Sequence, residues 1–230
     1  MPNASTVIAV VNGKGGVGKS TISSNLASYL YNSLDKETLI VDLDFQSSSL
    51  DWASLARSYD KNVCDVVSLA SEKTERHLIV KNTQMQIQRF RRKYRYIVID
   101  CRGAIDEFTI GAIRSADTVI TPLSSSALDV QATSTILDIF EQINASKGYT
   151  MNLYLVLNNV VANTNSLKDA RNAIQDMIKG YQGMVMCQTF IQKREDYKTA
   201  WGEGDSIFAT SNNKGKDEFL SLIREIKLDI

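Results

Sequence analysis

Eight consecutive residues near the start of the chain have the types and spacing needed to bind a triphosphate. They are Gly13-Lys14-Gly15-Gly16-Val17-Gly18-Lys19-Ser20, and they fit the phosphate-loop pattern G-x-x-x-x-G-K-[ST]. Glycine lacks a Cβ and permits positive φ, so backbone N–H groups can surround an anion. Lys19 can then reach the β- and γ-phosphates, and the Ser20 hydroxyl can bind Mg²⁺. The pattern predicts a site for a nucleoside triphosphate and Mg²⁺.

The segments on either side of this loop predict the elements that position it. Residues 6–12 form a short apolar, β-rich run, which is typical of a buried parallel strand. Apolar residues recur at helical spacing after the loop and predict a helix over residues 19–34, whose positive dipole end would face the phosphates. A strand, a glycine-rich loop and a helix together are the context that the pattern requires.

Three aspartates stand at the ends of two further predicted strands. The strand over 38–43 runs into Asp42 and Asp44, and the strand over 96–100 ends at Asp100. In a parallel sheet these ends share one edge with the phosphate loop, and the two-residue period of a strand places Asp42 and Asp44 on the same side. Nucleotide hydrolysis needs carboxylates for Mg²⁺ and for the attacking water. The alternative is that each aspartate caps the helix that follows its strand.

The segment from Lys14 to Thr21 resembles the deviant Walker A box of the ParA/MinD family of P-loop ATPases. The resemblance implies that the whole box, Thr21 included, holds ATP. It also implies that Lys14 crosses the interface of an ATP-bound homodimer and stabilises charge at the partner's nucleotide during hydrolysis. The alternative for Lys14 is an ordinary solvated lysine in a loop.

Two further segments are similar to motifs of the same family, each with one departure. Asp42-Leu43-Asp44-Phe45-Gln46 is similar to D-x-D-P-Q but has Phe45 in place of proline, and Asp100-Cys101-Arg102-Gly103 is similar to the end of a Walker B strand but has Arg102 where proline is common. The resemblance implies that Asp44 positions or activates water, with Lys14 and Lys19 as the other catalytic side chains. It implies that Asp42 helps to hold the water shell of Mg²⁺ and that Asp100 holds Mg²⁺ through water. It offers no role for Phe45 or Arg102.

The resemblance extends into the second half of the chain. Residues 116–123, followed by Ala127-Leu128-Asp129, resemble a strand and a loop that meets the dimer partner in the family. Asn158 follows an apolar strand where the family places an asparagine that binds adenine, and an amide can pair with both a donor and an acceptor on that base. A turn asparagine is the alternative for Asn158.

Basic residues gather in two places. The densest cluster comprises Arg89, Arg91, Arg92, Lys93 and Arg95, which fit a solvated helix end or, alternatively, contacts to DNA phosphates. A more scattered set lies near the C-terminus, where the resemblance implies nonspecific DNA contacts across the dimer. The candidates there are Arg194, Lys198, Lys214, Lys216 and Arg224.

Composition narrows the class of protein. A chain of 230 residues with 43% apolar residues suits a single domain, 1–230, and its 26 basic and 26 acidic residues leave no global field that would attract nucleic acid or membrane. The three cysteines, Cys64, Cys101 and Cys187, are far apart, which argues against metal clusters and disulfides and favours a reducing cytoplasm. Without a leader pattern, and with the loop so near residue 1, we expect the short family type that lacks an N-terminal helix-turn-helix domain.

Strand and helix patterns alternate along the chain, which predicts an α/β fold: a single domain with one mostly parallel, twisted sheet and helices on both faces. The resemblance to the ParA/MinD family implies that this fold is of the P-loop (SIMIBI) type. Besides the strands already named, we expect strands over 118–122, 151–158 and 184–189. We expect helices near 49–58, 82–93, 106–115, 128–146, 166–179, 194–201 and 216–227, and a mixed segment over 62–80.

Together these features predict a ParA-like partition ATPase with ATP and Mg²⁺ as ligands. The ATP-bound homodimer would bind DNA nonspecifically, associate with the nucleoid, and release DNA when a ParB-like or other cargo-bound activator stimulates hydrolysis. One alternative is a similar ATPase that positions a protein assembly. Another is a MinD-like, ATP-gated membrane or scaffold module. Membrane attachment through residues 219–226 is disfavoured because Asp217, Glu218, Glu225 and Asp229 would repel an anionic lipid surface.

Overall fold

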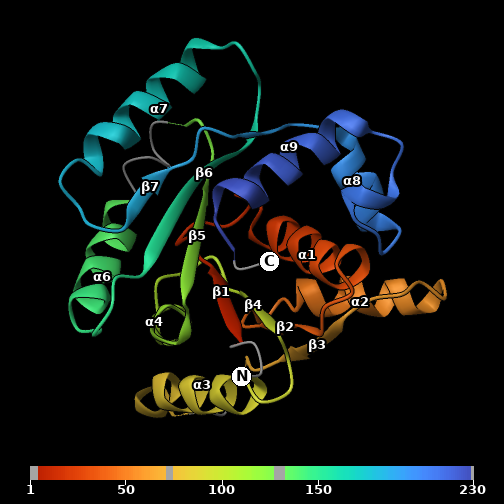
Figure 1. Cartoon of the computed structure of the whole chain (residues 1–230), viewed down its shortest axis with the longest axis horizontal. Coiled ribbons are helices and arrows are strands. Elements are labelled where there is room, and N and C mark those ends of the chain that lie inside the picture. Colours follow the sequence, from red (N-terminus) through yellow and green to blue (C-terminus); the bar gives the residue numbers. More distant parts are fainter. Residues whose placement is uncertain (1–4, 71–74, 127–132, 229–230) are drawn as a thin grey trace.

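The computed structural model describes residues 5–70, 75–126 and 133–228 and shows a parallel β-sheet between two layers of helices (Figure 1). Within the described residues, the strand order is β3-β2-β4-β1-β5-β6-β7, with β8 paired to β6. The strands are β1 (Thr6–Val10), β2 (Thr38–Asp42), β3 (Asp65–Ser68), β4 (Tyr96–Asp100), β5 (Thr118–Leu123), β6 (Asn152–Val160), β7 (Met184–Met186) and β8 (Ile191–Gln192). The expected α/β fold class is confirmed.

Alternate residues of the strands point to opposite faces of the sheet and belong to two separate hydrophobic cores. Val7 and Ala9 face the first core and Ile8 and Val10 the second, as the two-residue period of a strand requires. The first core is covered by α3 (Arg76–Phe90), α4 (Glu107–Ser115), α6 (Ser134–Ala145) and α7 (Asn165–Met177). The second is covered by α1 (Lys19–Ser28), α2 (Ser48–Ser58), α8 (Glu195–Gly202) and α9 (Asn213–Glu225), with two short helical turns, η1 (Tyr29–Ser33) and η2 (Ile207–Ala209).

Several element boundaries differ from the sequence prediction. The mixed segment 62–80 contains β3 and the start of α3, which begins at Arg76 rather than at residue 82. The strand expected over 184–189 is β7, which ends at Met186, and the short strand β8 that follows it was not predicted; both pair with β6. The sequence of such a short apolar run does not reveal where a strand ends. The loop residues Ala127-Leu128-Asp129 lie outside the described residues.

The strand order places the predicted site residues at one edge of the sheet. β1 lies between β4 and β5, and all three are parallel, so the loop after Val10 starts beside the carboxyl ends of its neighbours. The register pairs Val10 with Asp100 and Asp100 with Asp42. The helix after β1, α1, packs in the second core, whereas the helix after β4, α4, packs in the first. The chain therefore leaves these adjacent strands toward opposite faces of the sheet, and the crevice at such a point is the usual ligand site of an open parallel sheet.

Candidate functional site

The glycine-rich loop leads directly into α1. Gly18 precedes the helix with φ 92° and supplies no side-chain cap, so its place in the loop suits a residue without a Cβ. An added Cβ at Gly18 would also lie 2.0 Å from the Asn158 amide nitrogen. The first turn of α1 holds no acidic residue. The arrangement therefore presents the positive end of a helix dipole without a carboxylate to neutralise it, as an anion site requires.

The two lysines of the loop are placed differently. Lys19 is only 6% exposed, and its Nζ donates a 2.8 Å hydrogen bond to the Lys14 carbonyl. Burial lowers the pKa of Lys19, while the charges of Asp100 and Asp44 oppose that shift. The Lys14 residue is exposed. The structure thus holds Lys19 within its own loop and leaves the Lys14 side chain at the surface.

Asp100 is a buried carboxylate surrounded by hydroxyl groups. It accepts hydrogen bonds from Ser49 Oγ at 2.7 Å and from Ser23 Oγ at 3.2 Å, and the Ser20 hydroxyl also bonds to it. Burial raises its pKa to about 6, with the neighbouring Asp42 charge adding to the effect. Among the described residues no cluster of three or more acidic, histidine or cysteine side chains could enclose a metal ion. One carboxylate beside one hydroxyl instead fits Mg²⁺, which keeps several waters and binds substrate phosphates.

This raised pKa makes a prediction for the nucleotide-free chain. The folded pKa of Asp100, about 6, lies above its unfolded value of 3.8, so the folded chain gives up this proton less readily. The resulting cost to stability is absent well below pH 3.8, grows up to pH 6 and is then constant, on the order of 3 kcal/mol. We expect Asp100→Asn to gain stability over the wild type by about that much at pH 8, and by far less at pH 4. Urea unfolding at both pH values measures it, and a gain that did not vary with pH would contradict it.

Asp42 is buried beside Asp100, and both of its oxygens bind backbone groups. Oδ1 accepts from the Asp44 N–H at 2.9 Å, and Oδ2 accepts from the N–H groups of Ser49 and Leu50 at 2.9 and 3.2 Å. Ser47 supplies no side-chain cap to α2, so Asp42 caps the helix from the neighbouring strand. The geometry matches the capping alternative, and a role for Asp42 in the Mg²⁺ water shell stays a prediction.

Asp44 follows on the turn that Asp42 holds. It is half-buried, one oxygen accepts from the Gln46 N–H at 3.0 Å, and its charge offsets part of the lowering that burial causes in the pKa of Lys19. The structure therefore brings Asp44 to the same edge as Lys19, Asp42 and Asp100, as predicted from the strand ends. Whether Asp44 acts on water stays a prediction.

The two departures from the family motifs lie against each other. The Arg102 guanidinium stands over the Phe45 ring, 4.8 Å from its centre, and pairs with Asp106 at 3.2 Å. The ring of Phe108 meets Phe45 edge-on at 5.6 Å. Asp106 in turn caps α4 through the N–H groups of Phe108 and Thr109. The roles of Phe45 and Arg102 are not apparent from the sequence, because no local pattern reveals a contact between residues 57 positions apart. Here their packing stabilises the turn next to Asp44.

Weakening this packing should slow hydrolysis more than it weakens ATP binding. We expect Phe45→Ala to lower kcat roughly tenfold, because a small displacement of a catalytic side chain is costly, while the Kd for ATP changes less than twofold. Steady-state hydrolysis and equilibrium nucleotide binding measure the two effects. Tyr59→Ala, which removes a ring under Lys61 at the far end of α2, is the control. An equal loss of binding and turnover would contradict a positioning role.

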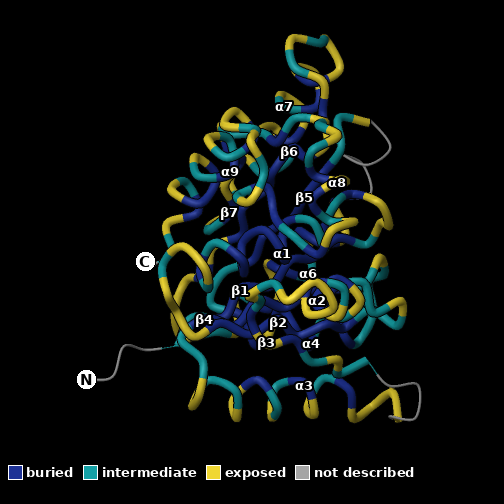
Figure 2. The backbone as a smooth tube through the Cα atoms, turned by 90° about the vertical axis from the view of Figure 1, so that its right-hand side faces the viewer, coloured by how far each residue is buried: buried dark blue, intermediate teal, exposed yellow. Residues whose placement is uncertain are grey.

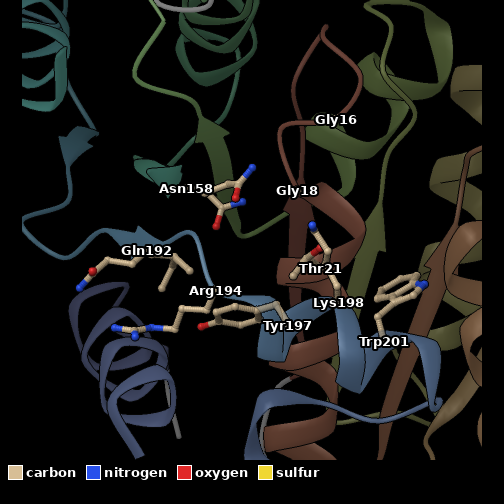
Figure 3. A pocket seen from close by; sticks show the side chains of 11 residues that line it. Gly16, Gly18, Thr21, Asn158, Gln192, Arg194, Tyr197, Lys198 and Trp201 are labelled. Atoms are coloured by element: carbon tan, nitrogen blue, oxygen red, sulfur yellow. The ribbon is translucent and has the colours of Figure 1, made fainter. Parts of the chain in front are cut away.

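A pocket of about 340 Å³ opens beside the loop (Figure 3). Gly16, Gly18 and Thr21 line the pocket on the side of the loop. Asn158 points toward Gly18, and its side-chain amide donates a 2.8 Å hydrogen bond to the Val17 carbonyl. Tyr197 and Trp201 of α8 also line the pocket. The volume falls in the range of small-molecule sites. Asn158 therefore lies in the pocket where a base attached to loop-bound phosphates would fit, and its amide also supports the loop.

The predicted DNA-binding residues do not form one unit. Arg194 and Lys198 line the pocket instead, Arg194 is paired with Glu218, and Lys198 lies 3.2 Å from Glu195. The other three are on α9, among the acidic residues of that helix: Lys214, Lys216 and Arg224. Sequence spacing alone did not reveal that neighbouring carboxylates neutralise part of this set. Their contact with DNA stays a prediction.

The chain was compared with known proteins. The CobQ/CobB/MinD/ParA nucleotide-binding domain family matches residues 8–207. The sporulation initiation inhibitor protein Soj of Bacillus subtilis is 24% identical, covering 96% of this chain and 97% of Soj. The carboxysome distribution maintenance protein A of Halothiobacillus neapolitanus is also 24% identical, covering 97% of each. Among solved structures, an aspartate-to-alanine variant of Cyanothece McdA in complex with ATP superposes with a TM-score of 0.79 at 14% identity, over 99% of this chain and 98% of that one.

Proposed function

Because the chain belongs to the CobQ/CobB/MinD/ParA nucleotide-binding family, we propose that it is a Mg²⁺-dependent ATPase that dimerises around ATP, binds DNA nonspecifically and positions a cargo. The observation that carries the proposal is the pair of loop lysines. Lys19 is held inside its own loop, and Lys14 stands exposed at the loop's entrance. A second cation so placed is suited to the nucleotide of a facing subunit.

The residues of the site divide the work of hydrolysis. The loop backbone and Lys19 hold the triphosphate, and the pocket beside Asn158 receives the base. Ser20 and Asp100 would hold Mg²⁺, whose charge offsets that of the phosphates. Asp44 orients the attacking water, and Asp42 keeps the turn that carries Asp44 attached to α2. Lys14 from the second subunit stabilises the charge that develops on the transferred phosphate.

The similar proteins, and not the residues of the site, bear on the cargo. The name of one similar protein refers to the maintenance of carboxysome distribution, and the name of another refers to the inhibition of sporulation initiation. Both a DNA cargo and a protein cargo fit the cycle of ATP-dependent dimerisation, stimulated hydrolysis and release. No helix in the described part of the chain has the length and apolarity to span a bilayer.

The test is binding to nonspecific duplex DNA without nucleotide, with ADP and with ATP, each at two salt concentrations. Binding that needs ATP and weakens with salt supports the proposal, because phosphate contacts release counterions. Failure to bind in all three states would reject the DNA step. Flotation with anionic liposomes and ATP, run in parallel, would then distinguish a membrane module from a protein scaffold.

A further inference from the structure

A basic groove lies between α3 and α4, apart from the nucleotide site. Its volume is about 440 Å³. Four cations line it: Lys81 and Arg89 from α3, Arg92 from the turn after α3, and Arg114 from the end of α4. The other lining residues are Gln84, Met85, Gln88 and Ser115. The lining therefore contains four positive charges and no carboxylate.

Three of the four groove cations come from a stretch of the chain with a large excess of basic over acidic residues. Between residues 76 and 95 the sequence has seven basic residues and no acidic one, in a protein whose 26 basic and 26 acidic residues balance. The basic residues are Arg76, Lys81, Arg89, Arg91, Arg92, Lys93 and Arg95. Such an excess on one helix makes a local positive field that the net charge of zero conceals.

Three of these seven residues, Lys81, Arg89 and Arg92, line the groove. The other four have contacts with side chains or carbonyls of the fold. Arg91 binds Asp117 at 2.8 Å and the Ser5 carbonyl at 2.7 Å, Lys93 pairs with Asp65, and Arg76 pairs with Glu107. Arg95 lies over the ring of Tyr96. The cluster predicted from the sequence thus separates into residues that stabilise the fold and residues that line the groove.

The four groove cations are exposed and, within the described residues, make no ion pair and no side-chain hydrogen bond. A favourable interaction with the C-terminal dipole of α3 accounts for Arg89 and Arg92. The same interaction at the C-terminus of α4 accounts for Arg114. It does not account for Lys81, which lies in the first half of α3, or for the convergence of cations from two helices on one groove. Figure 2 shows exposed turns of α3 on the side facing away from the rest of the molecule.

The groove lies away from the ATP site. Arg92 precedes β4 and Arg114 precedes β5, so both stand near the amino ends of those strands, whereas the phosphate loop follows the carboxyl end of β1. An anion bound in the groove would therefore not compete with the nucleotide. Its ligand must be a separate one.

We propose that this groove binds the phosphate backbone of duplex DNA. Arginine and lysine with glutamine amides are the side chains that contact phosphates without reading sequence. Lys81 and Arg92 are eleven residues apart, about 16 Å along a helix, which spans roughly five base pairs. Met85 is the one large apolar side chain in the lining, which is too little apolar surface for insertion into a lipid layer or for anchoring an acidic peptide.

The groove also supplies a reason for binding to depend on ATP, and this step rests on the proposed function. One groove contributes four cations, so the logarithm of the binding constant should fall with the logarithm of salt concentration with a slope of about −3.6. A dimer in which both grooves reach the same duplex contributes eight cations and a slope of about −7. ATP then strengthens DNA binding by joining two grooves, without a change inside either subunit.

The experiment compares two triple variants that remove the same charge. Arg89→Gln, Arg92→Gln and Arg114→Gln remove three cations from the groove, and Lys214→Gln, Lys216→Gln and Arg224→Gln remove three from α9. Binding to a random duplex is measured for each, and for the wild type, with ATP and with ADP over a range of salt. Intrinsic ATP hydrolysis of all three proteins checks that the fold and the site are intact.

We expect the groove variant to lose at least tenfold in DNA affinity with ATP, and its salt slope to fall from about −7 to about −2. The α9 variant should stay within twofold of the wild type. Equal affinity of the groove variant and the wild type, or a loss confined to the α9 variant, would overturn the groove assignment and leave the proposed function standing. A wild type that binds no DNA in any state would overturn the groove assignment together with the DNA step of the proposed function.

Two further arms separate other outcomes. DNA binding that is the same with ADP and ATP but is lost in the groove variant would support the groove and reject ATP gating. Phosphatidylserine vesicles and polyglutamate are tested as the competing ligands. Groove-dependent binding to either of these, with no groove-dependent binding to DNA, would overturn the assignment to DNA in favour of a membrane or an acidic protein.

Discussion

Lys14→Ala is expected to abolish ATP-dependent dimerisation and to lower activator-stimulated hydrolysis by on the order of 10³-fold, while ATP still binds. A cation supplied by a partner to a transferring phosphoryl group has effects of this size. Sedimentation velocity with and without ATP, together with turnover and equilibrium nucleotide binding, measures the three properties separately.

The structure explains why ATP binding should survive this substitution. The main chain at Lys14 is held by contacts that alanine keeps: its N–H donates to Asn12 Oδ1 at 2.9 Å, and its carbonyl accepts from Lys19 at 2.8 Å. Asn12 is in turn bound to the Pro122 carbonyl. These contacts use only main-chain atoms of Lys14, so the alanine variant keeps them.

Lys179→Ala, at an exposed lysine in the turn after α7, is the matched control and should behave as the wild type. Undiminished turnover and dimerisation of Lys14→Ala would remove the cross-subunit role. A loss of nucleotide binding would instead make Lys14 part of its own subunit's phosphate site.

Asp44→Ala is expected to keep ATP bound and unhydrolysed in a stable dimer, with kcat lower by about 10²- to 10⁴-fold, the usual contribution of a positioned acid–base group. The substitution removes one hydrogen bond to the Gln46 N–H, while Asp42 still holds the Asp44 N–H and the start of α2. The turn and the phosphate loop should therefore remain in place. Gel filtration of the ATP-loaded protein, followed by analysis of the bound nucleotide, measures the trapped state.

Asp51→Ala is the control for Asp44→Ala, because Asp51 is an exposed carboxylate in the first turn of α2. It should hydrolyse ATP at the wild-type rate. If Asp44→Ala failed to bind ATP, Asp44 would belong to the structural support of the site or to its Mg²⁺ ligands. If it turned over normally, another group would have to orient the water.

Much of the site could be predicted because its signals are local. Gly13 to Ser20 are contiguous, so their pattern is complete without knowledge of the fold. The strands before Asp42, Asp44 and Asp100 are short apolar runs, and a parallel sheet places such strand ends at one edge. The alternation of strands and helices likewise predicts the fold class from periodicity alone. The family match over residues 8–207 agrees with these local patterns.

Other features depend on which segments the fold brings together. Asp42 and Asp100 are neighbours because β2 pairs with β4 and not with β1, and the hydroxyls of Ser23 and Ser49 reach Asp100 from two different helices. No local pattern encodes these pairings. The contact between Phe45 and Arg102 was invisible for the same reason, although each residue had been noted as a departure from its motif.

The basic residues show the difference most clearly. In sequence, Arg89 to Arg95 are one cluster, and the C-terminal cations are another. In the fold, Asp117 and Asp65 bind two members of the first, Glu218 binds one of the second, and Arg114 joins from a different helix. The chemistry of the nucleotide site was determined by adjacent residues and their types. Which charges remain available for a ligand was decided only by tertiary packing, because a charge is neutralised by its neighbours in space and not by those in sequence.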